Sequence, residues 1–383
     1  LNIKSGNDNP VANILRYKGF DFQDMSVTFR SSPQRGMGGR GHIYKMNVDS
    51  IPIDTMRFLI RQDSSRVNFR LMVQNNKRNP QLVFKSIVNG YLDGNRIGAD
   101  AQFFDKHNVK GLDMGVMAEM LDSGINVHLA PYEPLIGYKT FRLNTDNYLF
   151  LGRDNRLSAK VDVIADDGTG VKVYSDDTDP TMLQDLTVSV NRLNLEQVTS
   201  VFPFMPLISG MMNGDFHLMQ DADKQISVVS DMQVGNMAYE RMPMGNLGSE
   251  FVYLQDGEDR HRVEARISRN DDEIGVLSGV YDNSGDGYLD ATLDLMRTPL
   301  SMVNGFIPDQ LLGFDGFAEG HLSVAGALSS PQVNGELYVD SAYVKSVPYG
   351  VVMRCDNDPV RIVGSNLLLE NFTLYGDNNS PLT

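Results

Sequence analysis

A glycine-rich string near the start of the chain could in principle bind a nucleotide. Residues 36–41 read GMGGRG and fit the G-x-G-x-x-G pattern of dinucleotide-binding loops. Such a loop works where it joins a parallel strand to a helix, because the helix N-terminus receives the pyrophosphate. A strand-like segment, residues 42–48, follows these glycines instead of a helix. The pattern therefore does not indicate a nucleotide site.

An acidic stretch has the beginning of a calcium-binding loop. Asp282, Ser284, Asp286 and Asp290 place oxygen atoms at alternating positions around a glycine, as in the first part of an EF-hand. That loop also needs a bidentate Glu at its last position and a helix on each side. Leu293 stands where the Glu is required. We predict an acidic hairpin turn here.

The other reactive side chains form no recognisable constellation. The six histidines lack H-E-x-x-H or H-x-H spacing, no G-x-S-x-G sequence occurs, and the carboxylates are scattered over turns and polar strand positions. Cys355 is the only cysteine, which excludes an intrachain disulfide and favours a small buried side chain. We predict that the protein is not an enzyme and has no metal and no cofactor.

The charge of the chain argues against one class of partner. Lys and Arg number 34 and Asp and Glu 49, which gives a net charge of −15. So acidic a chain repels phosphate backbones, and we expect no nucleic-acid partner. Anionic membrane surfaces are disfavoured for the same reason. Positive charge gathers only at Arg30, Arg35 and Arg40, which we interpret as a solvated loop.

Strict alternation of apolar and polar residues dominates the chain and is typical of strands with one buried and one wet face. In residues 289–295, every second residue is Leu or Ala, and the others are Asp or Thr. Residues 97–103 and 263–267 also alternate apolar residues with polar residues or glycine. Further alternating stretches surround residues 67–73, 161–163, 188–190, 322–324 and 337–339.

Asp-Gly and Asn-Gly steps separate these stretches at hairpin-like intervals, as tight turns require. We predict turns at residues 167–168, 213–214, 256–257, 286–287 and 334–335. Alternation and turns together predict a mainly β, antiparallel protein.

Three segments carry helix signals. Thr298 and Pro299 suit the N-cap and first position of a helix over residues 298–308. A capping-box pattern predicts a second helix over residues 194–203, and apolar spacing predicts a longer one over residues 109–124. We expect these helices to lie against the open side of a sheet or to cover an ordinary core.

The second half of the chain repeats itself with a displacement of 105 residues. Self-similarity at a fixed period indicates stacked units that bury their apolar faces against neighbours. We therefore predict an elongated sheet and assign residues 1–180 to an N-terminal β-rich segment, 181–285 to one repeat unit and 286–383 to a second, truncated one. The matched pairs are Leu195 with Leu300, Val198 with Val303, Pro203 with Pro308, and Pro243 with Pro348.

The second copy contains GHLSVAG at residues 320–326 and PQVNGELYV at residues 331–339. This pattern of Gly, Pro and alternating apolar residues resembles the repeat of the TamB family, the translocation and assembly module proteins related to AsmA-like and bridge-like lipid transfer proteins. The resemblance is best over residues 185–383. Residues 210–245 depart from it, since Gln220 stands where the second copy has Gly326.

The resemblance implies a fold and a place in the cell. The fold is a long antiparallel sheet curled into a trough, with few helices. The protein would work in the periplasm, anchored to the inner membrane by a segment absent from this chain, beside an Omp85-type outer-membrane partner or an associated lipoprotein. Because no run of about 18 apolar residues occurs, we expect the anchor to lie outside the segment given.

The implied function is phospholipid transfer between the inner and outer membranes, outer-membrane protein assembly, or both. Inward-facing apolar residues would solvate the acyl chains of phospholipid or of another acyl ligand. The same residues would serve equally well as the dry core of a closed barrel, sandwich or solenoid. The residues expected to line the groove are Val188, Val190, Val263, Ala265, Ile267, Leu289, Ala291, Leu293, Leu295, Leu322, Val324, Leu337 and Val339.

A second interpretation is an extracellular structural or glycan-binding adhesin module built as a β-sandwich or solenoid. Glycan sites generally use exposed aromatic platforms. The absence of Trp argues against this interpretation, whereas 15 Tyr leave it open.

Overall fold

The computed structural model describes residues 2–5, 20–34, 36–48, 51–76, 82–154, 156–176, 178–179, 181–257, 259–285, 287–307, 311–327, 329–357, 359–368, 373–376 and 380–382. Strands hold 74% of the residues and helices 4%. Neighbouring strands pair in antiparallel fashion, so the predicted fold class is confirmed. The chain forms two compact units: unit 1 is Leu1–Tyr174 with Glu196–Pro206, and unit 2 is Ser175–Leu195 with Leu207–Thr383.

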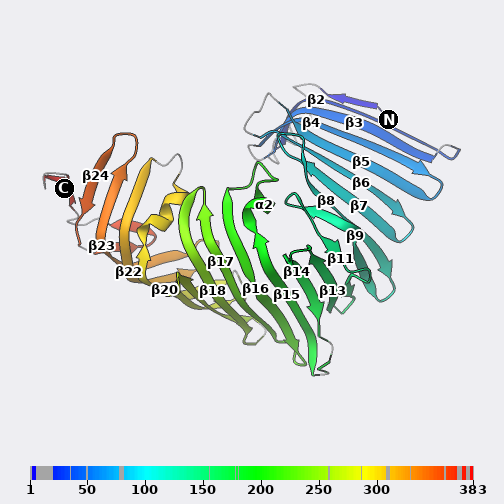
Figure 1. Ribbon diagram of the computed structural model, residues 1–383. Coiled ribbons are helices and arrows are strands. Elements are labelled where there is room, and N and C mark those ends of the chain that lie inside the picture. The colour runs from blue at the N-terminus through cyan, green and yellow to red at the C-terminus, as the bar shows by residue number, and fades with distance from the viewer. Residues whose placement is uncertain are drawn as a thin grey trace. The chain divides into compact units, whose positions relative to one another are not determined.

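Unit 1 is a ladder of successive hairpins (Figure 1), in which each strand from β2 to β8 pairs with the next. β12 then pairs with both β9 and β13, and β13 pairs with β14. The strands are β1 (Asn2–Ser5), β2 (Phe20–Ser32), β3 (Gly36–Val48), β4 (Ile51–Asp63), β5 (Arg66–Asn75), β6 (Phe84–Asp93), β7 (Arg96–Phe104), β8 (Lys110–Leu121), β9 (Gly124–Ile136), β10 (Lys139–Thr140), β11 (Arg142–Leu143), β12 (Tyr148–Gly152), β13 (Leu157–Ile164) and β14 (Gly170–Ser175).

Unit 1 also takes in most of the short helix α2 (Leu195–Thr199) and the residues that follow it. Val201 is 1% exposed and packs against Phe84 and Phe103. Phe202 and Phe204 add edge-on ring contacts to the same cluster. A separate core cluster is centred on Phe141 and the inward side of β13.

Unit 2 continues the hairpin pattern from β15 to β23, after which β24 and β25 pair with different stretches of β23. Its one regular helix in the described residues is the 3-10 helix η1 (Leu300–Phe306). The strands are β15 (Met182–Asn194), β16 (Ile208–Asp221), β17 (Ile226–Tyr239), β18 (Met242–Gln255), β19 (Arg260–Arg269), β20 (Asp272–Asp282), β21 (Tyr288–Pro299), β22 (Leu312–Gly326), β23 (Gln332–Ser346), β24 (Val351–Cys355), β25 (Val360–Val363), β26 (Asn366–Leu368), β27 (Leu374–Tyr375) and β28 (Pro381–Leu382).

The sheet of unit 2 is strongly curved. β17 and β22 lie five strand spacings apart, which is roughly 24 Å in a flat sheet. Yet adjacent residues of η1 reach both strands: Asn304 bonds Phe314 of β22, and a Cβ on Gly305 would lie 2.9 Å from the carbonyl oxygen of Tyr239 in β17. The two strand ends therefore converge on η1, as Figure 1 also shows. Among the described residues the first and last strands of each unit do not pair, so neither sheet closes.

The helix predicted over residues 109–124 is wrong, because this segment forms β8 and the start of β9. Its apolar spacing suits a helix, but Gly111 and Gly115 weaken helices by about 1 kcal/mol each. Gly115 instead permits close packing on β7, where a Cβ would lie 2.7 Å from the carbonyl oxygen of Ala99. β8 pairs with β7 on one side and with β9 on the other, and these two ladders favour a strand over a helix.

The other two helices are shorter than predicted. The one expected over residues 194–203 is limited to α2. η1 begins at Leu300 and has no side-chain cap, because the Thr298 hydroxyl donates to the Ile274 carbonyl at 2.6 Å instead. Pro308, its expected end, lies outside the described residues.

Two of the predicted turns are wrong. Asn213-Gly214 lies within β16 and Asn334-Gly335 within β23. The turns at residues 167–168 and 256–257 are confirmed, and residues 283–287 form the expected acidic hairpin connection, with Asp286 outside the described residues. Cys355 is buried, as predicted.

The interpretation of the basic cluster as a loop is also wrong. Arg30 lies in β2 and Arg40 in β3, whose glycine-rich start pairs with strands on both sides. Arg35 lies outside the described residues.

Candidate functional site

Cross-strand register builds one continuous apolar face in unit 2. Directly opposed residues of antiparallel strands point to the same side of a sheet. Leu277 of β20 opposes Leu293 of β21, which in turn opposes Leu322 of β22. One step along, Ala291 opposes Val324. The alternation seen in the sequence thus becomes a row of apolar side chains that crosses the strands.

All thirteen residues expected to line a groove lie on this one face. Val188 and Val190 connect to the rest through the registers of β16, β17 and β18, and β19 then carries the face to β20. Ala291 and Leu322 are buried, Ile267 is 38% exposed, and the other ten are half-buried. We call these thirteen residues, with the residues opposed to them, the apolar face.

Sequence reasoning missed several members of the apolar face. For most of them the signal was present in the sequence, because they sit two residues from another apolar position in an alternating stretch. Phe251 of β18, for example, opposes Ser230 of β17 and Ala265 of β19. The members missed are Leu186, Phe216, Leu218, Val228, Phe251, Tyr253, Leu277, Val333 and Val360.

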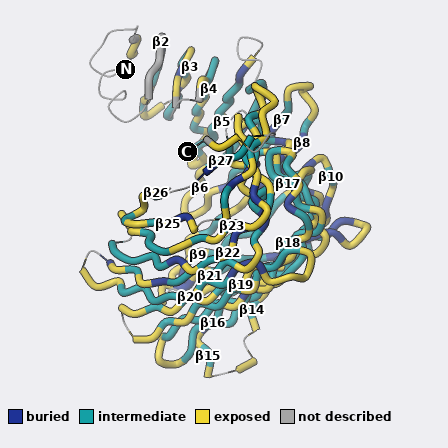
Figure 2. The backbone as a smooth tube through the Cα atoms, turned by 90° about the vertical axis from the view of Figure 1, so that its left-hand side faces the viewer, coloured by how far each residue is buried: buried dark blue, intermediate teal, exposed yellow. Residues whose placement is uncertain are grey.

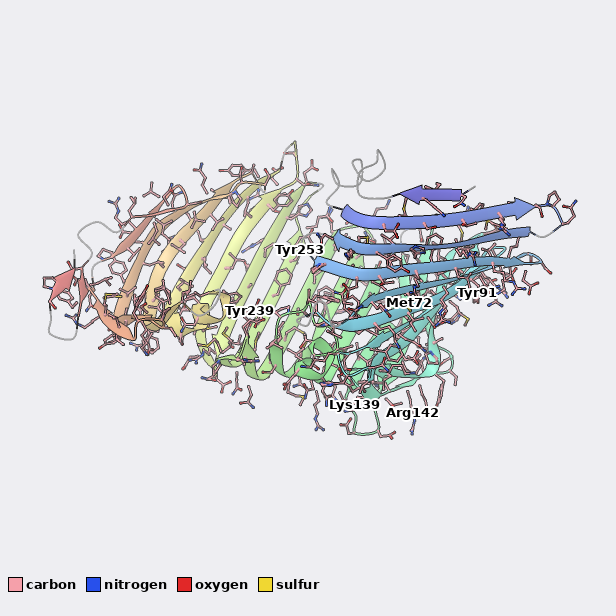
Figure 3. The ribbon with its side chains drawn as sticks, turned by 90° about the horizontal axis from the view of Figure 1, so that it is seen from above. Met72, Tyr91, Lys139, Arg142, Tyr239 and Tyr253 are labelled. Atoms are coloured by element: carbon pink, nitrogen blue, oxygen red, sulfur yellow. The ribbon has the colours of Figure 1, made fainter. Side chains whose placement is uncertain are left out.

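A polar aromatic row borders the apolar face at one end of the strands. The ring of His261 lies between those of Tyr253 and Tyr281, with centroid distances of 5.6 and 5.9 Å. The Tyr253 hydroxyl lies 2.7 Å from His261 Nδ1. Burial raises the pKa of the Tyr253 phenol. Figure 3 marks Tyr253 here and Tyr239 at the end where η1 packs.

The opposite face of unit 2 is polar and contains several ion pairs. His217 Nε2 lies 2.6 Å from Asp185, Arg262 lies 2.6 Å from Glu264, and His321 bonds Asp294. In β23, Glu336, Tyr338 and Asp340 on this side are exposed, whereas Leu337 and Val339 of the apolar face are half-buried. Figure 2 shows exposed and half-buried residues alternating in this way along several strands. Side chains crowd together inside a curved sheet and spread apart outside it. The exposure pattern therefore places the apolar face on the inside of the curve.

Unit 1 repeats the two-faced arrangement. Ile97, Ala99 and Ala101 of β7 oppose Ala118, Val116 and Met114 of β8, and polar residues occupy the other side. Both units are thus single-layer sheets with one apolar and one polar face.

No metal-binding geometry accompanies these faces in the described part of the chain. There, no group of three or more His, Cys, Asp or Glu side chains is placed to hold a metal ion. The acidic turn uses its oxygens internally, since Asp282 accepts from the backbone N–H of Ser284 at 2.8 Å. Over the same residues, no helix has the length and apolar character needed to cross a membrane.

Fold and faces together define a class, an antiparallel β protein whose curved, single-layer sheets are apolar on one side and polar on the other. Comparison of the chain with family models, with curated proteins and with solved structures gave no match in any of the three.

Proposed function

We propose that the apolar face of unit 2 binds the acyl chains of phospholipid. We further propose that the chain is a non-enzymatic periplasmic part of a TamB-like envelope protein that moves lipid between the inner and outer membranes, assists outer-membrane protein assembly, or does both. An Omp85-type protein or an associated lipoprotein would be its partner. The observation that carries the proposal is the in-register apolar face that runs from β15 to β23.

The incomplete burial of this face supports an open groove over a closed core. A closed sandwich or barrel buries the side chains between two layers, but ten of the thirteen residues stay half-buried and Ile267 is 38% exposed. Within unit 2, no second sheet packs on the face in the described residues. Exposed apolar patches of this kind mark binding surfaces.

The energetics of acyl binding fit such a face. Each CH₂ group transferred from water to an apolar surface contributes about 0.8 kcal/mol. Nine strands at a spacing of about 4.8 Å give a face roughly 38 Å long from β15 to β23. A lipid could lay its chains along this face and leave its headgroup at the polar rim, where Tyr253 and His261 lie.

The test is native mass spectrometry with lipid extraction on the purified chain. We expect phospholipid to co-purify with the parent and to be lost from the double variant Leu293→Arg with Val324→Arg, because two charges on the apolar face expel acyl chains. The matched control is Thr292→Arg with Ser323→Arg, on the same two strands but on the polar face. The control should keep its lipid.

Circular dichroism establishes that each variant is folded before lipid is measured. Lipid retained by a folded Leu293→Arg, Val324→Arg variant would contradict the proposal. So would a parent without lipid whose Arg variant cannot fold, because these residues would then be a structural core.

A further inference from the structure

Seven cations gather on the polar face of unit 1, in a chain that is otherwise acidic. The first 76 residues hold 11 Lys or Arg against 6 Asp or Glu, and the remainder holds 23 against 43. The seven come from the first five strands, and all seven are exposed. We call them the basic face, and they are Lys4, Arg30, Arg40, Arg57, Arg61, Arg66 and Arg70.

Strand register, not sequence proximity, assembles the basic face. Arg40 of β3 opposes Leu59 of β4, which opposes Arg70 of β5. Arg57 opposes His42 in the same way. Along β4 and β5 the arginines recur every fourth residue, about 13 Å apart, while neighbouring strands are about 4.8 Å apart. The charges therefore form a two-dimensional array.

These cations have no acidic partners within the described residues. None of the seven takes part in an ion pair there, and Arg66 instead lies 3.8 Å from the ring centre of Tyr91. Several arginines elsewhere are paired, as Arg96 is with Glu119 at 2.9 Å and Arg142 with Asp166 at 3.0 Å. Unpaired guanidinium groups in one array point to an anionic partner outside the chain.

The centre of the basic face is hollowed. A concavity of about 720 Å³ is lined by Lys4, Arg40, Arg57 and Arg70, with the hydroxyls of Ser26 and Thr28 and the ring of His42 among them. Its floor is apolar, since Leu59 is 52% exposed there beside Met72. Figure 3 marks Met72 and Tyr91 on β5 and β6. Cations and hydroxyl donors around an apolar floor suit a phosphate group attached to an amphiphile.

We propose that the basic face docks on an anionic phospholipid bilayer and binds its phosphate groups. A bilayer surface is a two-dimensional array of anions, which matches the arrangement of the arginines. A second copy of this chain is the alternative occupant, and two of the acids on the polar face of unit 2 already have partners, Asp185 with His217 and Glu264 with Arg262. The net charge of −15 disfavours anionic membranes only if it is spread evenly over the chain. Here the first 76 residues carry an excess of positive charge and the remainder carries the negative charge.

This proposal does not rest on acyl binding by the apolar face. The basic face lies in the other unit and on polar strand positions. If vesicle binding by the basic face is lost, acyl-chain binding by the apolar face can still be measured, and the reverse also holds.

Vesicle co-sedimentation tests the proposal on the full chain. Vesicles of phosphatidylcholine, with and without about 30% phosphatidylglycerol, are compared at low and high salt. We expect the parent to bind the anionic vesicles at least about tenfold more tightly than the neutral ones, and to release them at high salt. The triple variant Arg57→Gln, Arg61→Gln, Arg70→Gln should lose at least about tenfold in affinity for the anionic vesicles.

The matched control is Arg262→Gln, Arg266→Gln, Arg361→Gln, which changes the net charge equally but lies on the polar face of unit 2. It should bind as the parent does. Equal loss in both triple variants would overturn the proposal, as would salt-independent or equal binding to neutral vesicles. Absence of vesicle binding with salt-sensitive self-association in sedimentation velocity would identify a second copy as the occupant. The parent measurements hold even if a variant fails to fold.

Discussion

Two asparagines show how single residues stabilise a sheet that has no second layer. Asn213 Oδ1 accepts from the backbone N–H of Arg192 at 2.8 Å, where the register of β15 shifts. Asn334 Oδ1 accepts from the N–H of Gly364, also at 2.8 Å. In both cases the side chain satisfies a main-chain donor that the ladder leaves free. These Asn residues therefore support irregular strand pairing, although the Asn-Gly step favours a turn.

At the same scale, Tyr138 should show an unusually high pKa. Burial raises it to about 12, assisted by the hydrogen bond from its hydroxyl to Asp105 Oδ2 at 3.0 Å and by the charge of that carboxylate. The folded-state pKa lies above the unfolded value of about 10. The stability that Tyr138 contributes is therefore complete below pH 10 and is lost as the pH rises through about 12.

Ultraviolet titration of tyrosinate checks this expectation. The difference between the parent and Tyr138→Phe should contain one phenol that titrates near pH 12. Asp105→Asn removes the charge, so the same phenol should then titrate at lower pH. A difference curve centred at pH 10 in the parent would contradict the assignment.

At the scale of elements, the two short helices occupy equivalent places in the repeat but differ in their packing. α2 follows β15, and η1 follows β21 after the same interval of 105 residues. Val201, just after α2, is 1% exposed, whereas the equivalent Phe306 of η1 is 67% exposed and stacks on Tyr239 with a centroid distance of 4.7 Å. η1 is held instead by the polar side chain of Asn304.

Replacing Asn304 should detach η1 from β22. Its side chain donates to the Phe314 carbonyl at 2.9 Å and accepts from the Phe314 N–H at 2.7 Å, and it is itself buried. Asn304→Ala leaves both main-chain groups unsatisfied, so we expect a loss of about 2 kcal/mol in the free energy of unfolding. Urea denaturation of the parent and of the variant measures this difference in the free energy of unfolding. Val303→Ala, at a residue 45% exposed in the same helix, should cost far less.

At the scale of the whole molecule, stability belongs to two separate units. The core clusters around Phe141 and around Phe84 both lie within unit 1, and the chain returns to unit 1 only through residues 196–206. Val201 is the buried centre of that return segment. A defect there should consequently affect one unit and spare the other.

Val201→Ala makes this expectation measurable. Removal of two buried methyl groups should cost about 2 kcal/mol. Hydrogen exchange followed by mass spectrometry should show faster exchange in β6 and β7, which carry Phe84 and Phe103, and unchanged exchange in β20 to β22. Uniform acceleration over both units would mean that they unfold as one.

Much of this fold could be predicted from alternation alone. A strand sends successive side chains to opposite faces whatever its partner, so Leu289 to Leu295 could be sorted correctly without any knowledge of register. The same local rule placed Val188 and Val339, which lie far apart along the sheet, on the same side of it.

What could not be predicted depends on partners distant in sequence. The apolar spacing around Gly115 indicated a helix, and Gly335 indicated a turn. Each glycine is instead required where a neighbouring backbone comes close; a Cβ on Gly335 would lie 2.2 Å from the carbonyl oxygen of His321. The basic face escaped notice because Arg40, Arg57 and Arg70 are separated by 13 to 17 residues and meet only through strand pairing.

The repeat of unit 2 has a consequence for how such a protein could evolve. One period, from β15 to β20, contains six strands, so β21 runs in the same direction as β15. Because the number is even, duplication of a period inserts a segment that begins and ends in phase, with the apolar side chains still on the same side. Each strand bonds only to its neighbours, so the insertion disturbs no distant core. Gene duplication could thus lengthen the apolar face in steps of roughly 29 Å.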